Sequence, residues 1–213
     1  MPFIVKPLTR ALLFTSALLA TSASYAATQP GSVTAFTDTL TYDVFTVSSK
    51  GWRDPAFGDM GWTHKSDWGS FTAKKGQTVT ITLISETAGI HPGISIWFRG
   101  KDDTAPNSYV VDHFYPQQAN FTKFGATDES TGASIGDIVM RIQKFGYDLD
   151  GNTQHVKGIN GKKDGVPGQL QMTFTASHTG SYMFVVGGFN PDATVDPTIK
   201  SFNIDTTVTV TTP

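Results

Sequence analysis

Three residues of one short tract, Met60, Trp62 and His64, are of types that could bind a metal ion together. They alternate along the chain, and alternate residues of an extended strand point to the same face. A thioether, a large aromatic ring and an imidazole would therefore share one face. Thioethers and imidazoles bind soft and borderline metal ions, and the ring would keep water away. This tract is the first candidate for a metal site.

Cysteine is absent from the chain, which holds five histidines. Without a thiolate, the iron–sulfur, cysteine–zinc and blue-copper classes of site are excluded. His113 lies in a strand-like apolar stretch over residues 109–114, and His64, like it, lies among aromatic and apolar neighbours. Such neighbours would keep water away from an ion bound at either histidine. Two neutral imidazoles in such surroundings suit Cu(I), a soft ion that accepts few ligands. The alternative for each is a hydrogen-bonded, half-buried histidine with no metal.

The other three histidines are weaker candidates. His91 precedes Pro92-Gly93, as a turn residue would, and it is the fallback if His113 is not a ligand. His155 lies in a long polar loop and His178 in a turn, where solvated surface side chains are expected.

Calcium is a second cofactor candidate. Asp148 and Asp150 place oxygen donors around Gly151, as at the start of a calcium-binding loop, and a bound ion would stiffen this segment. No glutamate occupies the closing position of the EF-hand pattern, and the alternative is a polar turn.

Catalytic motifs are weak in this sequence, and no enzyme is expected. Ser134 stands in a Gly-x-Ser-x-Gly match over residues 132–136, but the polar residues before it make a poor strand for a nucleophile elbow. A copper monooxygenase with a histidine brace needs histidine as the first mature residue. The predicted mature chain starts at Ala27 instead.

The first 26 residues are predicted to be a signal peptide. Lys6 and Arg10 give a basic start, residues 11–20 an apolar run, and residues 24–26 a small-residue cleavage site. Residues 27–213 then form one domain, exported to the periplasm or the outer cell surface. No later apolar run approaches membrane-spanning length, and a net charge of -2 gives no basic field for nucleic acid.

Alternating apolar residues predict the elements that must position the site. Six strands are expected, over residues 42–47, 78–83, 93–98, 169–174, 181–186 and 202–210. They indicate an all-β fold, an antiparallel β-sandwich or a jelly-roll-like barrel. Two long irregular segments, 50–70 and 146–168, interrupt them. Residues 135–142 have helical spacing after a capping box of Ser134 and Asp137 and predict one short helix, although they could also form a strand.

The segment Trp62-Thr63-His64, in an exported and cysteine-free β-rich chain with a distant histidine, resembles the copper-binding surface proteins of methanotrophs, the family of CorA and the C-terminal part of MopE. That resemblance implies that Trp62 is oxidised to kynurenine and joins two histidines around one copper ion, mostly as Cu(I). Carried over, His64 is the first imidazole. His113 is the second because of its surroundings, with His91 as the fallback.

The resulting expectation is an exported, non-enzymatic protein that holds one Cu(I) ion for copper acquisition or homeostasis. Its partners would be the copper ion and outer-membrane or cell-surface components. The alternative is a surface adhesion or carbohydrate-binding β-sandwich module, in which tryptophans such as Trp52, Trp68 and Trp97 stack on sugars.

Overall fold

The computed structural model describes residues 33–54, 59–62, 66–109, 115–116, 120–152, 160–191 and 195–212. For residues 53–54, 59–62 and 115–116 it describes the backbone and its pairing. The predicted signal peptide lies outside these residues, and so do His64, His113 and His155. All regular elements of the described part are β-strands. Within that part, no helix is long and apolar enough to cross a membrane.

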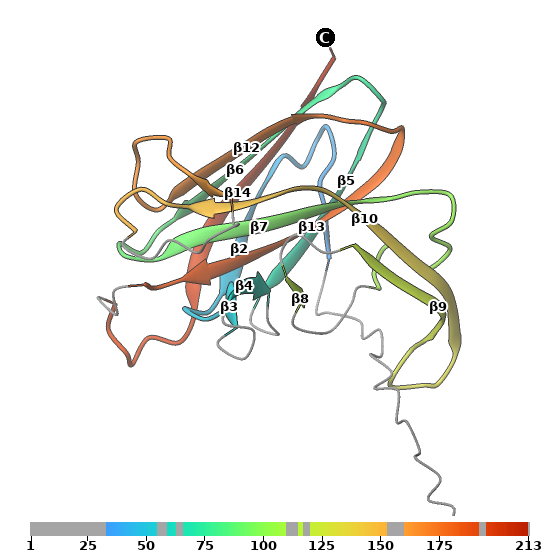
Figure 1. The fold of residues 1–213 in the computed structure, drawn as a ribbon, viewed down its shortest axis with the longest axis horizontal. Coiled ribbons are helices and arrows are strands. Elements are labelled where there is room, and N and C mark those ends of the chain that lie inside the picture. The colour runs from blue at the N-terminus through green and yellow to red at the C-terminus, as the bar shows by residue number, and fades with distance from the viewer. Residues whose placement is uncertain are drawn as a thin grey trace, which may run out of the picture.

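A seven-stranded sheet forms the centre of the molecule (Figure 1). Its strands are, in spatial order, β1 (Thr34–Ala35), β5 (Asp67–Ala73), β13 (Gly180–Phe189), β7 (His91–Arg99), β10 (Ser134–Asp148) and β11 (Gly161–Lys162), with β9 (Phe121–Thr127) also paired to β10. The pairs are antiparallel except β1 with β5 and β10 with β11.

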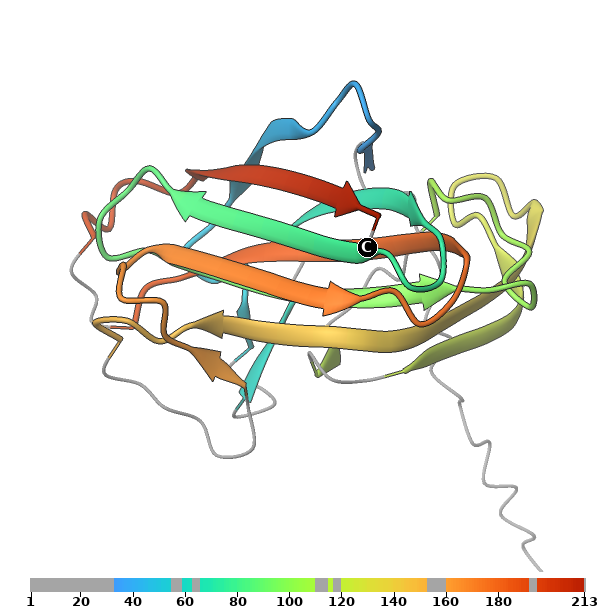
Figure 2. The same cartoon turned by 90° about the horizontal axis from the view of Figure 1, so that it is seen from above.

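A second, antiparallel sheet packs against one face of the first (Figure 2). It consists of β12 (Gln169–Thr175), β6 (Thr78–Ser85), β14 (Phe202–Thr211) and β2 (Tyr42–Val47). A small third sheet contains β3 (Arg53–Asp54), β4 (Asp59–Trp62) and β8 (Tyr115–Pro116). The molecule is an open sandwich with a three-stranded ribbon, and the sandwich prediction is confirmed; it is not a closed barrel.

The inter-sheet core, which is the apolar layer between the two large sheets, is regular. Residues of the second sheet alternate between this core and the surface, as the pleat of a half-buried strand requires. Phe184 of β13 is fully buried at its centre and contacts the rings of Phe36, Phe45 and Phe71. Further members come from both sheets, among them Val79, Ile81, Leu83, Ile94, Ile96, Leu170, Val186, Ile204 and Val208.

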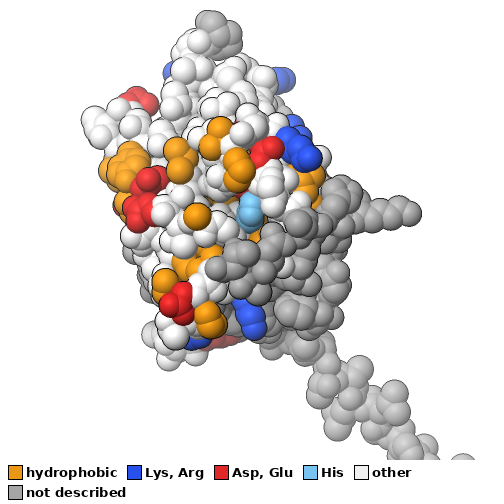
Figure 3. All heavy atoms as spheres, turned by 90° about the vertical axis from the view of Figure 1, so that its left-hand side faces the viewer, with side chains coloured by type: hydrophobic (Ala, Val, Ile, Leu, Met, Phe, Trp, Pro, Cys, Tyr) orange, Lys and Arg blue, Asp and Glu red, His pale blue; other side chains and the backbone are white. Residues whose placement is uncertain are grey.

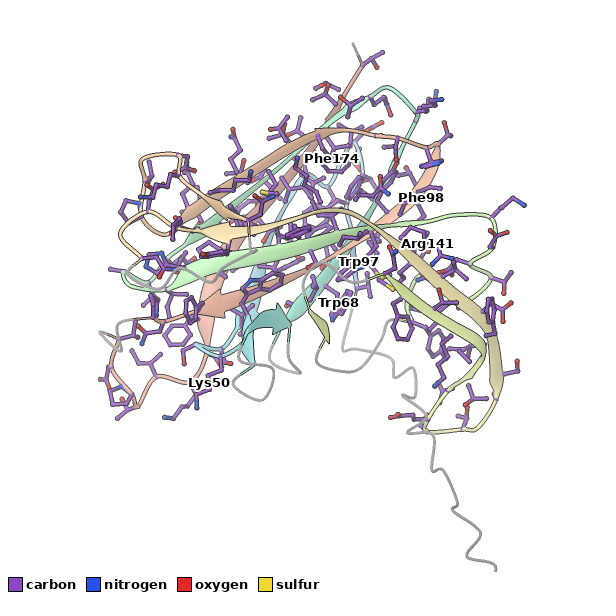
Figure 4. The ribbon with its side chains drawn as sticks, viewed as in Figure 1. Lys50, Trp68, Trp97, Phe98, Arg141 and Phe174 are labelled. Carbon is purple, nitrogen blue, oxygen red and sulfur yellow. The ribbon has the colours of Figure 1, made fainter. Side chains whose placement is uncertain are left out.

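The opposite face of the seven-stranded sheet carries a second cluster, which we call the tryptophan cluster. Trp68 of β5 and Trp97 of β7 stack there with ring centroids 5.8 Å apart (Figure 4), and Trp52 joins them from the segment before β3. Since β7 and β13 are buried on both faces, nearly every residue in them is buried. The other members include Ala105, Phe121, Ala126, Ile138, Met140, Tyr147, Met183, Val185 and Phe189.

All six predicted strands are confirmed, but the predicted helix at residues 135–142 is wrong. These residues belong to β10, which runs for 15 residues. The pairing of β10 with β9 shifts register between Ser134 and Gly136 and again between Gly136 and Ile138. Each extra residue at a bulge breaks the two-residue alternation. The apolar spacing of this bulged strand therefore imitates that of a helix.

The predicted irregular segments also contain short strands. The tract 50–70 includes β3, β4 and the beginning of β5, and the tract 146–168 includes the end of β10 and β11. Two-residue and four-residue strands are too short to show alternation in a sequence.

Candidate metal centre

The ribbon β3–β4–β8 positions the Trp-x-His tract. Met60 of β4 pairs with Arg53 of β3, and Trp62 at the end of β4 pairs with Tyr115 of β8. Both pairings are antiparallel. The tract that contains Trp62 is therefore paired through its backbone with Tyr115, which follows the predicted ligand His113 by two positions in the sequence. His64 and His113 themselves lie outside the described residues.

The chain on either side of this ribbon is attached to the seven-stranded sheet. The amide of Trp52 donates to the carbonyl of Gly188 at 3.0 Å, and β4 contacts β13. After the tract, the hydroxyl of Ser66 donates to the carbonyl of Gly51. The Trp-x-His tract therefore lies, along the chain, between these two hydrogen-bonded points, and both bonds involve the turn at residues 51–52.

The indole ring of Trp52 packs against Gly93 of β7, a position that has no side chain. A Cβ atom at Gly93 would come within 2.3 Å of the indole Nε1 and Cδ1 atoms. The indole is fully buried, and its Nε1 has no hydrogen-bond partner among the described residues. Glycine inside an otherwise apolar strand often marks such a close approach. That signal was present in the sequence, and our sequence reasoning did not use it.

Asp67, the first residue of β5, connects the two large sheets beside the tract. Its carboxylate accepts hydrogen bonds from the amides of Thr46 in β2 at 3.3 Å and of Trp68 at 2.9 Å. Burial raises the pKa of this carboxyl above its usual value, which the two amides only partly offset. Asp67 is therefore a partly buried titratable group, three positions after His64 in the sequence.

His91, the fallback ligand, has a hydrogen-bonding role of its own. It is buried at the start of β7, and its Nδ1 lies 2.6 Å from the Oδ2 of the fully buried Asp148. Among the described residues, no three histidine or acidic side chains gather as a metal would require. This arrangement favours a structural role for His91, and its role as a ligand stays a prediction.

The predicted calcium loop uses its carboxylates to hold backbone amides. Asp148 accepts from the amides of Asp150 and Gly168, and Asp150 accepts from those of Asp164 and Gly165, at 2.6 to 2.8 Å. These bonds connect residues 148–150 to residues 164–168. Calcium at this loop stays a prediction that no contact of the described residues supports.

The other sequence candidates have ordinary surroundings. Ser134 is exposed at the start of β10, not at a turn between a strand and a helix, so the Gly-x-Ser-x-Gly match does not form a nucleophile elbow. His178 is exposed, where a surface histidine was expected, and stacks on Phe98 with ring centroids 4.7 Å apart. On the face that Figure 3 shows, the acidic and basic side chains of the described residues are scattered and form no large patch of one sign.

The tryptophans proposed for sugar stacking are not at the surface. Trp52 and Trp97 are 0% exposed and Trp68 is 4% exposed, all within the tryptophan cluster. A sugar ring can stack only on an accessible face. The carbohydrate-binding alternative is therefore unsupported by the three residues on which it relied.

Comparisons with known proteins identify the family. A family model for copper(I)-binding proteins like CorA matches residues 24–196. The solved structure of CorA from Methylomicrobium album BG8, a surface-associated copper-binding protein important in copper acquisition, is 32% identical and has a TM-score of 0.76, with 88% of this chain and 100% of that chain covered.

A second solved structure supports the fold. MopE from Methylococcus capsulatus, a secreted protein in which an oxidized tryptophan facilitates copper binding, is 17% identical with a TM-score of 0.57, covering 89% of this chain and 94% of its own. No curated protein sequence matches the chain. With most of its length matched by the family model, the chain belongs to the CorA-like family of copper(I)-binding proteins.

Proposed function

We propose that this protein is exported and holds one Cu(I) ion between His64 and His113, beside Trp62, for copper acquisition or homeostasis. The observation that carries the proposal is the antiparallel pairing of Trp62 with Tyr115. Family membership supports copper as the ion. CorA, at 32% identity, is described as important in copper acquisition, which supports the physiological role.

The register of that pairing favours His113 over His91 as the second ligand. In an antiparallel ladder, the position two residues after Trp62 and the position two residues before Tyr115 form the next pair on the same face. The sequence places His64 and His113 at those two positions. Directly opposite residues have Cα atoms only about 4.5–5.5 Å apart, so two imidazoles there could share one ion.

The ligand set fits Cu(I) chemically. Two neutral imidazole nitrogens are a sufficient basis for a soft ion with a low coordination number. An indole has an N–H donor and no free lone pair, so an unmodified tryptophan is a poor ligand. We propose that dioxygen cleaves the C2–C3 bond of the Trp62 indole to give N-formylkynurenine. Hydrolysis with release of formate then leaves kynurenine, whose ketone and aniline are donors.

The mechanism is reversible binding, with no catalytic step. Only neutral imidazole binds the ion, so protons compete with copper as the pH falls through the ordinary histidine range near 6.5. Copper is held at neutral pH and released in acid. The partners of such a carrier would be other components of the periplasm or the cell surface that supply or receive copper.

Metal analysis of protein from its native host tests the proposal. We expect one equivalent of copper and a Trp62 peptide with the mass of kynurenine. His64→Ala and His113→Ala should each weaken Cu(I) binding by more than about 100-fold. Loss of a residue that only orients a metal ligand already weakens metal binding by about 10- to 100-fold. His178→Ala, an exposed histidine, is the matched control and should leave affinity unchanged. Copper binding that survives both His64→Ala and His113→Ala would overturn the proposal.

A further inference from the structure

Arg99, the last residue of β7, is a buried cation whose donors are all used. Its guanidinium and the carboxylate of Asp103 are each only 2% exposed and form an ion pair. The remaining donors reach the carbonyls of Ala105 at 3.0 Å, Pro106 at 3.3 Å and Tyr109 at 3.0 Å. A guanidinium has five N–H donors in a fixed fork. Arg99 therefore closes the loop of residues 100–109 around itself.

The same loop is attached to β10. Asp103 also accepts from the amide of Val139 at 2.8 Å, and the amides of Thr104 and Ala105 both donate to the carbonyl of Asp137. The hydroxyl of Thr104 accepts from the amide of Asp137 at 2.8 Å in return. These reciprocal bonds hold the loop against the first part of β10, and such a network makes the loop rigid.

Tyr109 is the point where this rigid loop ends, and it is held twice. Its carbonyl accepts from Arg99, and its hydroxyl donates to Asp128 at 2.7 Å. Asp128 is buried and in turn accepts from the amides of Ser130 and Thr131 and from the Ser130 hydroxyl. These hydrogen bonds, led by that of the Ser130 hydroxyl, hold the pKa of Asp128 far below its usual range. The acceptor for Tyr109 is thus a fixed carboxylate at any physiological pH.

We propose that Arg99 and the Tyr109–Asp128 pair are positioning residues for the second copper ligand. This inference rests on the proposed function, because it assumes that His113 binds copper. Tyr115 follows Tyr109 by six positions, and His113 lies between them in the sequence. Tyr109 is held by Arg99 and Asp128, and Tyr115 is paired with Trp62. Tyr109 and Tyr115, the described residues that flank residues 110–114 in the sequence, are therefore each held by partners elsewhere in the fold.

Fixing both ends matters because copper must otherwise order the ligand segment itself. Ordering a backbone segment on binding costs conformational entropy, and a preorganised site avoids that cost. Releasing one end should weaken copper binding even where the fold survives. The loop contains no copper ligand, so any such effect must act through the adjoining segment.

Tyr109→Phe is the sharpest test, because it removes one hydroxyl and keeps the ring. Tyr42→Phe is a matched control: the Tyr42 hydroxyl donates to the carboxylate of Asp205 at 2.6 Å on the outer face of the second sheet. We expect Tyr109→Phe to weaken Cu(I) binding about tenfold, at the low end of the 10- to 100-fold range for residues that orient a ligand. Tyr42→Phe should leave affinity within about twofold, with a similar shift in thermal midpoint for both variants.

A double-mutant cycle separates positioning from general stability. If Tyr109 acts through His113, Tyr109→Phe should add no further loss of affinity in a His113→Ala background. Arg99→Lys, which keeps the charge but has three donors in place of five, should weaken copper binding at least as much as Tyr109→Phe.

Equal affinity of Tyr109→Phe and the wild type, or an equal loss in Tyr42→Phe, would overturn this inference. Full additivity with His113→Ala would do the same. In either case the proposed function stands, provided that the wild type binds copper and His113→Ala does not. A wild type that binds no Cu(I) overturns both.

Discussion

The two faces of the seven-stranded sheet are built on different principles. The inter-sheet core pairs one regular sheet with another, and in the second sheet its residues alternate with outward-facing residues, many of them threonines. The tryptophan cluster is covered by short strands and loops, and it depends on large rings and on glycines that let the chain approach. One face supplies stability through repetition, and the other holds an irregular segment in place.

The difference bears on the candidate site, because its Trp62 lies in the ribbon β3–β4–β8. A regular strand pair presents its side chains at fixed spacing and buries them against a partner sheet. Among the described residues, the ribbon β3–β4–β8 forms a sheet of its own, separate from the two large sheets, so its residues can differ from the pattern of the core. Function commonly resides on such connections, supported by a rigid scaffold.

The largest expected effect is a loss of stability on the regular face. Phe184→Ala should lower the free energy of unfolding by about 3–5 kcal/mol, the usual cost of emptying a buried aromatic site. Urea titration measures this as a lower midpoint with an unchanged slope. Phe184→Leu should cost less and leave Cu(I) affinity unchanged under native conditions. A strong loss of copper affinity in folded Phe184→Leu would show that the two faces are not independent.

A pair of glycine substitutions separates the faces more finely. An added Cβ would lie 2.3 Å from the ring of Phe184 at Gly69 and 2.3 Å from the indole of Trp52 at Gly93. Gly69→Ala and Gly93→Ala should therefore each destabilise the fold by about 1–3 kcal/mol through overpacking. Only Gly93→Ala should also weaken Cu(I) binding, because Trp52 leads into β3. Equal copper affinities of the two variants would contradict the link between the position of Trp52 and the candidate site.

The smallest expected effect is a pH dependence at Asp67, which connects the two large sheets. Burial raises the pKa of this carboxyl in the folded protein. The protonated form is thus favoured by folding, and stability relative to a neutral residue falls as the pH rises through the raised pKa. Asp67→Asn keeps an oxygen acceptor and should gain stability over the wild type between acid and neutral pH. Stability curves of the two proteins that run parallel from pH 3 to 7 would argue against this.

The regular face could be predicted from the sequence, and the irregular face largely could not. Strands such as Tyr42–Val47 and Gln169–Thr175 have a clear alternation because one side faces the core. Strand β10 was mistaken for a helix because its bulges shift the apolar positions. Short strands such as Arg53–Asp54 are defined by tertiary pairing, which leaves no periodic signal.

The sequence predicts the members of the candidate site on unequal grounds. Trp62 and His64 are close in sequence and matched a family motif, whereas His113 had only an apolar neighbourhood to recommend it. The pairing of Trp62 with Tyr115 supplies what the sequence lacked, which is the long-range register between two segments. The role of Arg99 was invisible for the same reason, since its partners include backbone carbonyls up to ten positions away.

X-ray absorption at the copper edge, on the wild type and on His113→Ala loaded with Cu(I), tests the central claim most directly. The wild type should show a low-coordinate Cu(I) ion with the scattering pattern of two imidazoles, and His113→Ala should show one imidazole fewer. A wild-type spectrum without two imidazoles, or an imidazole contribution that is the same in His113→Ala, would contradict a site shared by His64 and His113.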